Sequence, residues 1–121
     1  MIKLTNVTKI YKTGVRALND VNLTIDPGEF VYVIGTTGSG KSTFIKLLYR
    51  EEKVTSGRVE VAGQDVSKLK NRKVPYFRRN IGVVFQNFRL LPKKTVFENV
   101  AFALEVIDTP RAEIRQRVRA T

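Results

Sequence analysis

One stretch of the sequence has residue types and spacing suited to binding phosphate. It reads GTTGSGKS from Gly35 to Ser42 and fits the phosphate-binding pattern G-x-x-x-x-G-K-[ST]. Its glycines would let the backbone turn tightly, so that successive N–H groups face an anion. We expect Lys41 to reach the β- and γ-phosphates of a nucleoside triphosphate, and the Ser42 hydroxyl to be a ligand of Mg²⁺. The predicted nucleotide-binding residues in this stretch are Gly35, Thr36, Thr37, Gly38, Ser39, Gly40, Lys41, Ser42 and Thr43.

The flanking residues would place this loop between a strand and a helix. The run from Glu29 to Ile34 is typical of a buried strand, and Lys41 to Arg50 has the apolar spacing of an amphipathic helix. The N-terminus of such a helix carries a partial positive charge that attracts anions. An ordinary glycine-rich turn between a strand and a helix is the alternative interpretation.

The composition of the 121 residues, with 42% apolar residues, is that of one globular domain. The chain has no cysteine, which excludes disulfides and thiolate metal sites and favours a reducing compartment. No apolar run approaches the roughly 20 residues that a transmembrane helix needs. We therefore expect a soluble protein, or one that is held at a membrane by something else.

Positive charge is concentrated in one part of the chain. The net charge is +11, and no acidic residue occurs between Val66 and Phe97. Such a stretch can attract nucleic acid, anionic lipid or an acidic protein. Alternatively, the cations form a solvated face and the interleaved phenylalanines belong to the core. The cations of this stretch are Lys68, Lys70, Arg72, Lys73, Arg78, Arg79, Arg89, Lys93 and Lys94.

Alternating strands and helices are expected along the chain. Besides the strand before the phosphate loop, the pattern predicts strands over Ile2 to Tyr11, Ala17 to Ile25, Arg58 to Val61 and Ile81 to Phe85. The region between the last two is partly helical, and Pro75 suits the first turn of a helix. Thr95 and Glu98 have the spacing of a capping box, which predicts a helix to about Ile107. Pro110 then begins a last helix.

Together these features resemble an ABC-type ATPase. The resemblance rests on Tyr11 about 25 residues before the phosphate loop, the turns at Asp26–Glu29 and Ser56–Gly57, and the segment from Ile81 to Gln86. It implies an α/β fold of the P-loop NTPase class: an antiparallel β-subdomain, the phosphate-loop strand and helix, and the start of a helical subdomain.

The same resemblance assigns roles to individual residues. It implies that Tyr11 stacks on the adenine of ATP and that Gln86 contacts both Mg²⁺ and the attacking water. An aromatic face can hold a purine, and a neutral amide can orient water without adding charge beside the triphosphate. Lys41 and Gln86 are therefore the predicted catalytic residues, and Ser42 and Gln86 the predicted ligands of the Mg²⁺ that arrives with the nucleotide.

The segments 69–79, 85–92 and 95–100 narrow the resemblance to the FtsE group of cell-division ATPases. This group implies a cytoplasmic ATPase that docks on the inner face of the cell membrane, on an integral membrane FtsX-like subunit. It also implies a homodimer in the full-length form. Exporters of lipoproteins and macrolides share much of the pattern and remain an alternative. A binding-only module without turnover and a basic nucleic-acid-binding protein are further functions that the residues leave open.

Several motifs that the resemblance implies are not found in the sequence. The chain has no histidine, and neither an LSGGQ-like string nor an apolar strand ending in Asp-Glu follows Gln86. We therefore expect residues 1–121 to correspond to the N-terminal half of the family domain, and to bind Mg²⁺-ATP weakly with little turnover. The strand before Gly35 would lack its parallel neighbours, so we also expect self-association, strand exchange or poor ordering around Gln86.

Overall fold

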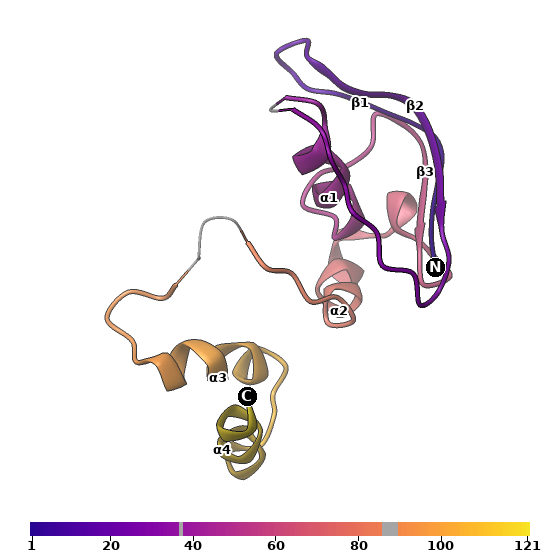
Figure 1. Cartoon of the computed structure of the whole chain (residues 1–121). Coiled ribbons are helices and arrows are strands. Elements are labelled where there is room, and N and C mark those ends of the chain that lie inside the picture. Colours follow the sequence, from indigo (N-terminus) through magenta and orange to yellow (C-terminus); the bar gives the residue numbers. More distant parts are fainter. Residues whose placement is uncertain (37, 86–89) are drawn as a thin grey trace. The chain divides into compact units, whose positions relative to one another are not determined.

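The computed structural model describes residues 1–36, 38–85 and 90–121 of the chain. The chain divides into two compact units, residues 1–81 and residues 82–121. The N-terminal unit contains a sheet and the helices α1 and α2, and the C-terminal unit contains the helices α3 and α4 (Figure 1).

A four-stranded antiparallel sheet organises the N-terminal unit. Its strands are β1 (Ile2–Ile10), β2 (Arg16–Ile25), β3 (Ser56–Val61) and β4 (Gln64–Asp65), in the order β2-β1-β3-β4. The central strand β1 places Leu4 opposite Leu23 on one side and Val59 on the other. The structure thus confirms the expected antiparallel β-subdomain. The bounds of β1, β2 and β3 lie within two residues of those predicted, whereas β4 was not predicted.

The pairing of β1 with β3 contains an irregularity that depends on glycine. The register shifts between Thr5 and Thr8, and Gly57 on β3 has φ +94°. A Cβ at position 57 would collide with the backbone carbonyl of Asn6. The Ser56–Gly57 turn signal therefore marks a close approach of two backbones at the start of β3.

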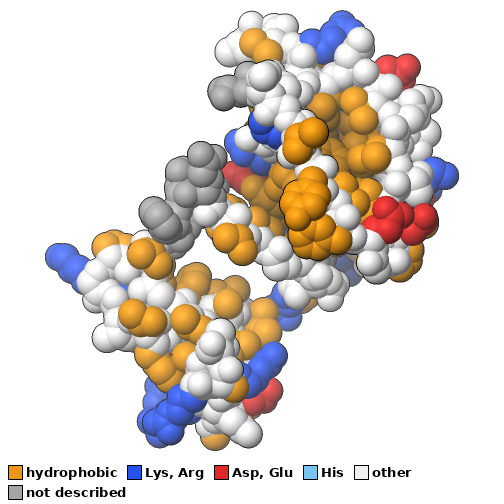
Figure 2. Space-filling model, in the orientation of Figure 1, with side chains coloured by type: hydrophobic (Ala, Val, Ile, Leu, Met, Phe, Trp, Pro, Cys, Tyr) orange, Lys and Arg blue, Asp and Glu red, His pale blue; other side chains and the backbone are white. Residues whose placement is uncertain are grey.

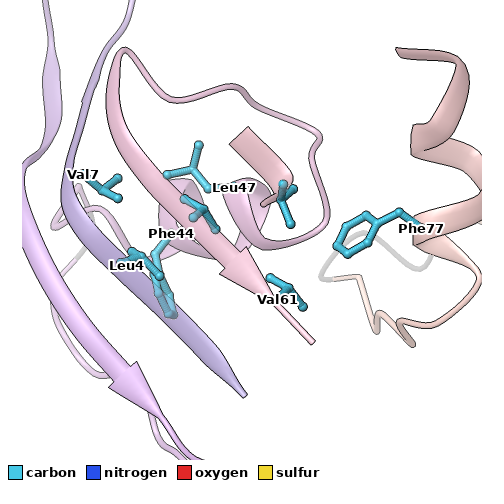
Figure 3. Close-up of a cluster of buried hydrophobic side chains, with 8 residues drawn as sticks. Leu4, Val7, Phe44, Leu47, Val61 and Phe77 are labelled. Carbon is cyan, nitrogen blue, oxygen red and sulfur yellow. The ribbon is translucent and has the colours of Figure 1, made fainter. Parts of the chain in front are cut away.

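The hydrophobic core of this unit lies between the sheet and α1 (Lys41–Leu48), as Figure 3 shows. Phe44 and Leu47 are buried as the predicted apolar helix face requires, whereas Ile45 remains 40% exposed. Burial of these side chains against β1 and β3 is the main stabilising term that holds α1 on the sheet. The buried cluster consists of Leu4, Val7, Phe44, Leu47, Val59, Val61, Val66 and Phe77.

A short helical region follows the sheet and returns to α1. It consists of two 3-10 turns, η1 (Val66–Lys68) and η2 (Asn71–Lys73), and the helix α2 (Val74–Arg78). Pro75 lies in the first turn of α2, as predicted. Phe77 is 4% exposed and fixes α2 to the core.

Two arginines connect the C-terminal end of α1 to this region. Arg50 is buried, and its Nη1 donates to the carbonyls of Val66 and Leu69, at 3.2 and 2.6 Å. Arg78 on α2 donates to the carbonyls of Tyr49 and Arg50, both at 2.9 Å. The last carbonyls of a helix lack partners within the helix, so Arg78 satisfies groups that would otherwise need water.

Two predicted strands are not formed. The structure assigns no strand to residues 29–34 or to residues 81–85. In the first segment Phe30 and Ile34 are 82% and 88% exposed, and in the second Val84 is fully exposed. A strand needs a hydrogen-bonded neighbour, and neither segment belongs to the four-stranded sheet. The prediction of a strand is therefore wrong for both segments, although both are rich in apolar residues.

The C-terminal unit is a pair of helices, α3 (Val96–Val106) and α4 (Arg111–Ala120). The capping box is confirmed: the Glu98 amide donates to the Thr95 hydroxyl at 3.0 Å, and the Thr95 amide donates to the Glu98 carboxylate at 3.3 Å. Pro110 precedes α4, also as predicted. The small core between the helices consists of Ala101, Ile114 and Val118, with Leu104 packed against it.

Candidate nucleotide-binding site

The loop from Gly35 to Ser42 is shaped by glycines in left-handed backbone conformations. Gly40, the N-cap residue just before α1, has φ +95°, and a Cβ there would lie 2.6 Å from the carbonyl oxygen of Ala17 on β2. Only glycine combines this conformation with this close approach. The loop is thereby held against β2, and α1 starts at a fixed place.

Among the described residues, no hydrogen-bond acceptor is found for the first amides of α1. Gly40 provides no side-chain cap, and the first turn contains no acidic residue. Between described residues, the first helical bond runs from the Phe44 amide to the Gly40 carbonyl at 2.9 Å. By helix geometry, the amides of Lys41, Ser42 and Thr43 precede that bond and point out of the helix end. Together with the helix dipole they form a site that favours an anion.

The Lys41 ammonium lies over the same loop. It donates to the carbonyl oxygens of Gly35 and Thr36, the latter at 3.3 Å. These are neutral acceptors, and phosphate oxygens are stronger acceptors for an ammonium group. The side chain is therefore placed where it can exchange backbone carbonyls for phosphate.

Ser42 is exposed in the first turn of α1. No carboxylate occurs in the loop or in the first turn of α1. A single hydroxyl is a weak site by itself, but it fits a Mg²⁺ ion whose other ligands are phosphate oxygens and water. The donor set is thus compatible with a metal that arrives with a nucleotide.

Tyr11 lies beside α1, although it is 30 residues away from Lys41 in sequence. Its hydroxyl and the hydroxyl of the buried Thr43 are hydrogen-bonded at 2.9 Å. The Tyr11 amide donates to the Val15 carbonyl at 2.9 Å, which fixes the turn between β1 and β2. The structure therefore brings the predicted base-stacking residue next to the predicted phosphate loop.

Two predicted site residues, Thr37 and Gln86, lie outside the described residues. The described ones lie in the loop before α1 and in its first turn, and Tyr11 adjoins this turn through Thr43. They are Gly35, Thr36, Gly38, Ser39, Gly40, Lys41, Ser42 and Thr43.

An open apolar groove of about 390 Å³ adjoins the loop. Leu18, Val21 and Leu23 of β2 line it together with residues 31–34, and Lys41 is also among its lining residues. Figure 2 shows hydrophobic side chains at the surface of this unit. Sequence reasoning missed the groove because it placed residues 29–34 in a buried strand.

Comparison with known proteins assigns the chain to a protein family. The sequence model described as ABC transporter matches residues 18–121. The chain belongs to this family. The ABC transporter assignment covers the phosphate loop, α1 and both helices of the C-terminal unit.

Individual relatives agree with the ABC transporter assignment. The chain is 57% identical over 118 residues to the cell division ATP-binding protein FtsE of Bacillus subtilis (98% of this chain, 52% of the relative). It is 59% identical over 108 residues to FtsE of Mycobacterium tuberculosis (88% and 47%). The chain thus spans about half the length of these curated relatives.

Solved structures show the same ABC transporter fold. The dimeric post-hydrolysis state of the ATP-binding cassette MJ0796 bound to ADP and Pi matches with a TM-score of 0.88 at 40% identity. The match covers 99% of this chain and 55% of that chain. The expected partial P-loop NTPase fold of the ABC type is therefore confirmed.

Sequence reasoning also missed Lys9. Its Nζ lies 5.1 Å from the centre of the Tyr11 ring and 3.4 Å from a Glu52 carboxylate oxygen. The sequence contains one signal for the contact of Lys9 with Tyr11: the two residues are two positions apart, and alternate residues along a strand share a face. That spacing predicts proximity to Tyr11 but gives no indication of Glu52.

Proposed function

We propose that this chain binds Mg²⁺-ATP as the N-terminal part of an ABC-type ATPase subunit. The observation that carries the proposal is the convergence of the Lys41 ammonium and the uncapped N-terminus of α1 on one glycine-rich loop. Tyr11, held next to that loop through Thr43, is suited to stack on the base. The ADP and Pi named for the MJ0796 cassette support the same kind of ligand.

Each residue of the site has a proposed role. Lys41 moves from the loop carbonyls to the β- and γ-phosphates, and the first amides of α1 hold phosphate oxygens. The Ser42 hydroxyl is a ligand of Mg²⁺, which neutralises charge on the phosphates when it is bound. Gln86 orients the attacking water. The chain has no histidine and no LSGGQ-like string after Gln86, so we propose that these 121 residues bind nucleotide with little turnover.

Titration calorimetry with Mg²⁺-ATP tests the proposed binding. Lys41→Ala should weaken binding by at least about tenfold, since a hydrogen bond to a charged group contributes about 1.5–3 kcal/mol. Lys46→Ala is the matched control, because it removes the same charge from the last turn of the same helix. Equal affinities of the two variants, or no heat with the folded unmodified chain, would show the proposal to be wrong.

For the biological role, we propose an FtsE-like subunit that acts in bacterial cell division. The names of the B. subtilis and M. tuberculosis relatives support this role. In the proposal, ATP hydrolysis in a full-length homodimer changes the conformation of an FtsX-like integral membrane partner. The dimeric MJ0796 cassette supports the dimer. Co-purification of the full-length protein with an FtsX-like subunit tests the role, and co-purification with a lipoprotein or macrolide exporter subunit would favour the alternative.

We further propose that the subunit lies on the cytoplasmic face of the cell membrane. No helix in the described part of the chain is long and apolar enough to cross a bilayer. The cations of the segment 68–79 are exposed on the N-terminal unit, and Val74 and Phe77 fix that segment to its core. Clusters of four to eight such cations attract acidic headgroups.

Vesicle sedimentation tests the membrane proposal. The chain should bind phosphatidylglycerol vesicles more strongly than phosphatidylcholine vesicles, and less strongly as salt rises. Replacing Lys70, Arg72 and Lys73 with glutamine should weaken this binding. Equal binding to both vesicle types would contradict the proposal. Tight, steeply salt-dependent binding to an arbitrary DNA duplex would favour the nucleic-acid alternative instead.

A further inference from the structure

Lys9 at the end of β1 is held in place by several groups at once. Its ammonium donates to the backbone carbonyl of Lys53 at 2.7 Å and forms an ion pair with Glu52 at 3.4 Å. Its side chain is only 13% exposed. The same ammonium lies 5.1 Å from the centre of the Tyr11 ring. A lysine this well anchored has lost most of its conformational freedom in the folded state.

Tyr11 is fixed by the same arrangement and by α1. Lys9 lies over one face of its ring, and Thr43 holds its hydroxyl at 2.9 Å. No second ring or cation packs on Tyr11 among the described residues. The ring is partly exposed. Three separate segments, namely β1, the loop after α1 and the start of α1, therefore determine where the ring lies.

We propose that Lys9 is a positioning residue that presents Tyr11 to the nucleobase and raises the affinity of the site for the base. This inference rests on the proposed function, and it deepens that function by separating base binding from phosphate binding. A cation on one face of an aromatic ring interacts with its negative π-face and draws electron density toward itself. The opposite face then becomes a better stacking surface for an electron-rich purine. A ring that is already immobile also loses less entropy when the base binds.

The test compares two ligands that share phosphates but differ in the base. Affinities for Mg²⁺-ATP and for Mg²⁺-tripolyphosphate are measured by titration calorimetry on the full chain. Lys9→Met keeps most of the side-chain volume but removes the charge. It should weaken ATP binding about three- to tenfold and leave tripolyphosphate binding unchanged. Lys9→Arg keeps a cation over the ring and should keep ATP affinity within about twofold.

A matched control removes the same charge from the same strand. Lys3 lies on β1 and is exposed, so Lys3→Met should change neither affinity. If Lys9→Met binds ATP as the unmodified chain does, or weakens both ligands equally, the proposal is wrong. The second result would mean that Lys9 acts only through general attraction of anions. By contrast, failure of the proposed function would appear as no binding of either ligand by the unmodified chain.

A second variant keeps the proposal testable if Lys9→Met fails to fold, as judged by circular dichroism. Glu52→Gln removes the carboxylate that holds Lys9 but leaves the ammonium and the carbonyl of Lys53. It should lower the ratio of ATP affinity to tripolyphosphate affinity about twofold. An unchanged ratio in this variant would overturn the proposal.

Discussion

The N-terminal unit, residues 1–81, buries eight apolar side chains in one cluster, whereas the cluster in residues 82–121 contains three, counted over the described residues. The larger cluster joins residues as distant in sequence as Leu4 and Phe77. The smaller unit depends more on local interactions: the capping box of Thr95 and Glu98, and the ion pair of Glu113 with Arg117 at 3.4 Å. Tertiary packing therefore determines the first unit, and local sequence contributes a larger share in the second.

The largest effect is expected in the core of the N-terminal unit. Leu47→Ala removes a side chain that is 2% exposed and should lower the free energy of unfolding by about 2–5 kcal/mol. Ile45→Ala is the control, because Ile45 lies on the same helix but is 40% exposed. Denaturant unfolding followed by circular dichroism compares the two. Similar losses of unfolding free energy in the two variants would mean that burial of the side chain does not determine stability at these positions.

A smaller effect is expected at the helix cap of the C-terminal unit. Thr95→Ala leaves the Glu98 amide without its acceptor and should destabilise α3 by about 1 kcal/mol. Thr95→Ser keeps the hydroxyl and should retain most of the stability. Hydrogen exchange measures this, with faster exchange expected in α3 and unchanged exchange in α1. Faster exchange in α1 as well would mean that the two units do not open independently of each other.

The smallest effect concerns pH. The Thr95 amide and hydroxyl hold the pKa of Glu98 below its ordinary value of 4.5. Because the pKa is lower in the folded state, the contribution of Glu98 is complete above pH 4.5 and is lost as the pH falls through the folded-state pKa. The protection of α3 amides against hydrogen exchange, expressed relative to the intrinsic exchange rate at each pH, should therefore fall on acidification. Glu98→Gln should remove this dependence, and its persistence in that variant would exclude Glu98 as the cause.

The glycine-rich loop and the start of α1 could be predicted from the sequence because their signals are local. The spacing of Gly35, Gly40 and Lys41 determines a loop whose shape depends on a few adjacent residues. The same holds for the capping box and for Pro75 in the first turn of α2. The strands β1, β2 and β3 were also predictable, since each has apolar alternation bounded by turn residues, whereas the two-residue β4 has no apolar residue.

The errors occur where structure depends on a distant partner. Residues 29–34 and 81–85 are as apolar as true strands, but the sequence alone cannot say whether a neighbouring strand is available. The ion pair of Lys9 with Glu52 joins residues 43 apart in sequence and has no local pattern. Such contacts arise from the fold and become visible only when it is known.

The hydrogen bonds that Arg50 and Arg78 form at the C-terminal end of α1 have a mechanical consequence. Eight helical residues form a strut of about 12 Å, too short to bend appreciably. A small rotation at its N-terminal end would be transmitted along the helix to Tyr49 and Arg50, and through their carbonyls to Arg78 on α2. The two hydrogen bonds of Arg78 therefore couple any movement of α1 to α2 within the N-terminal unit.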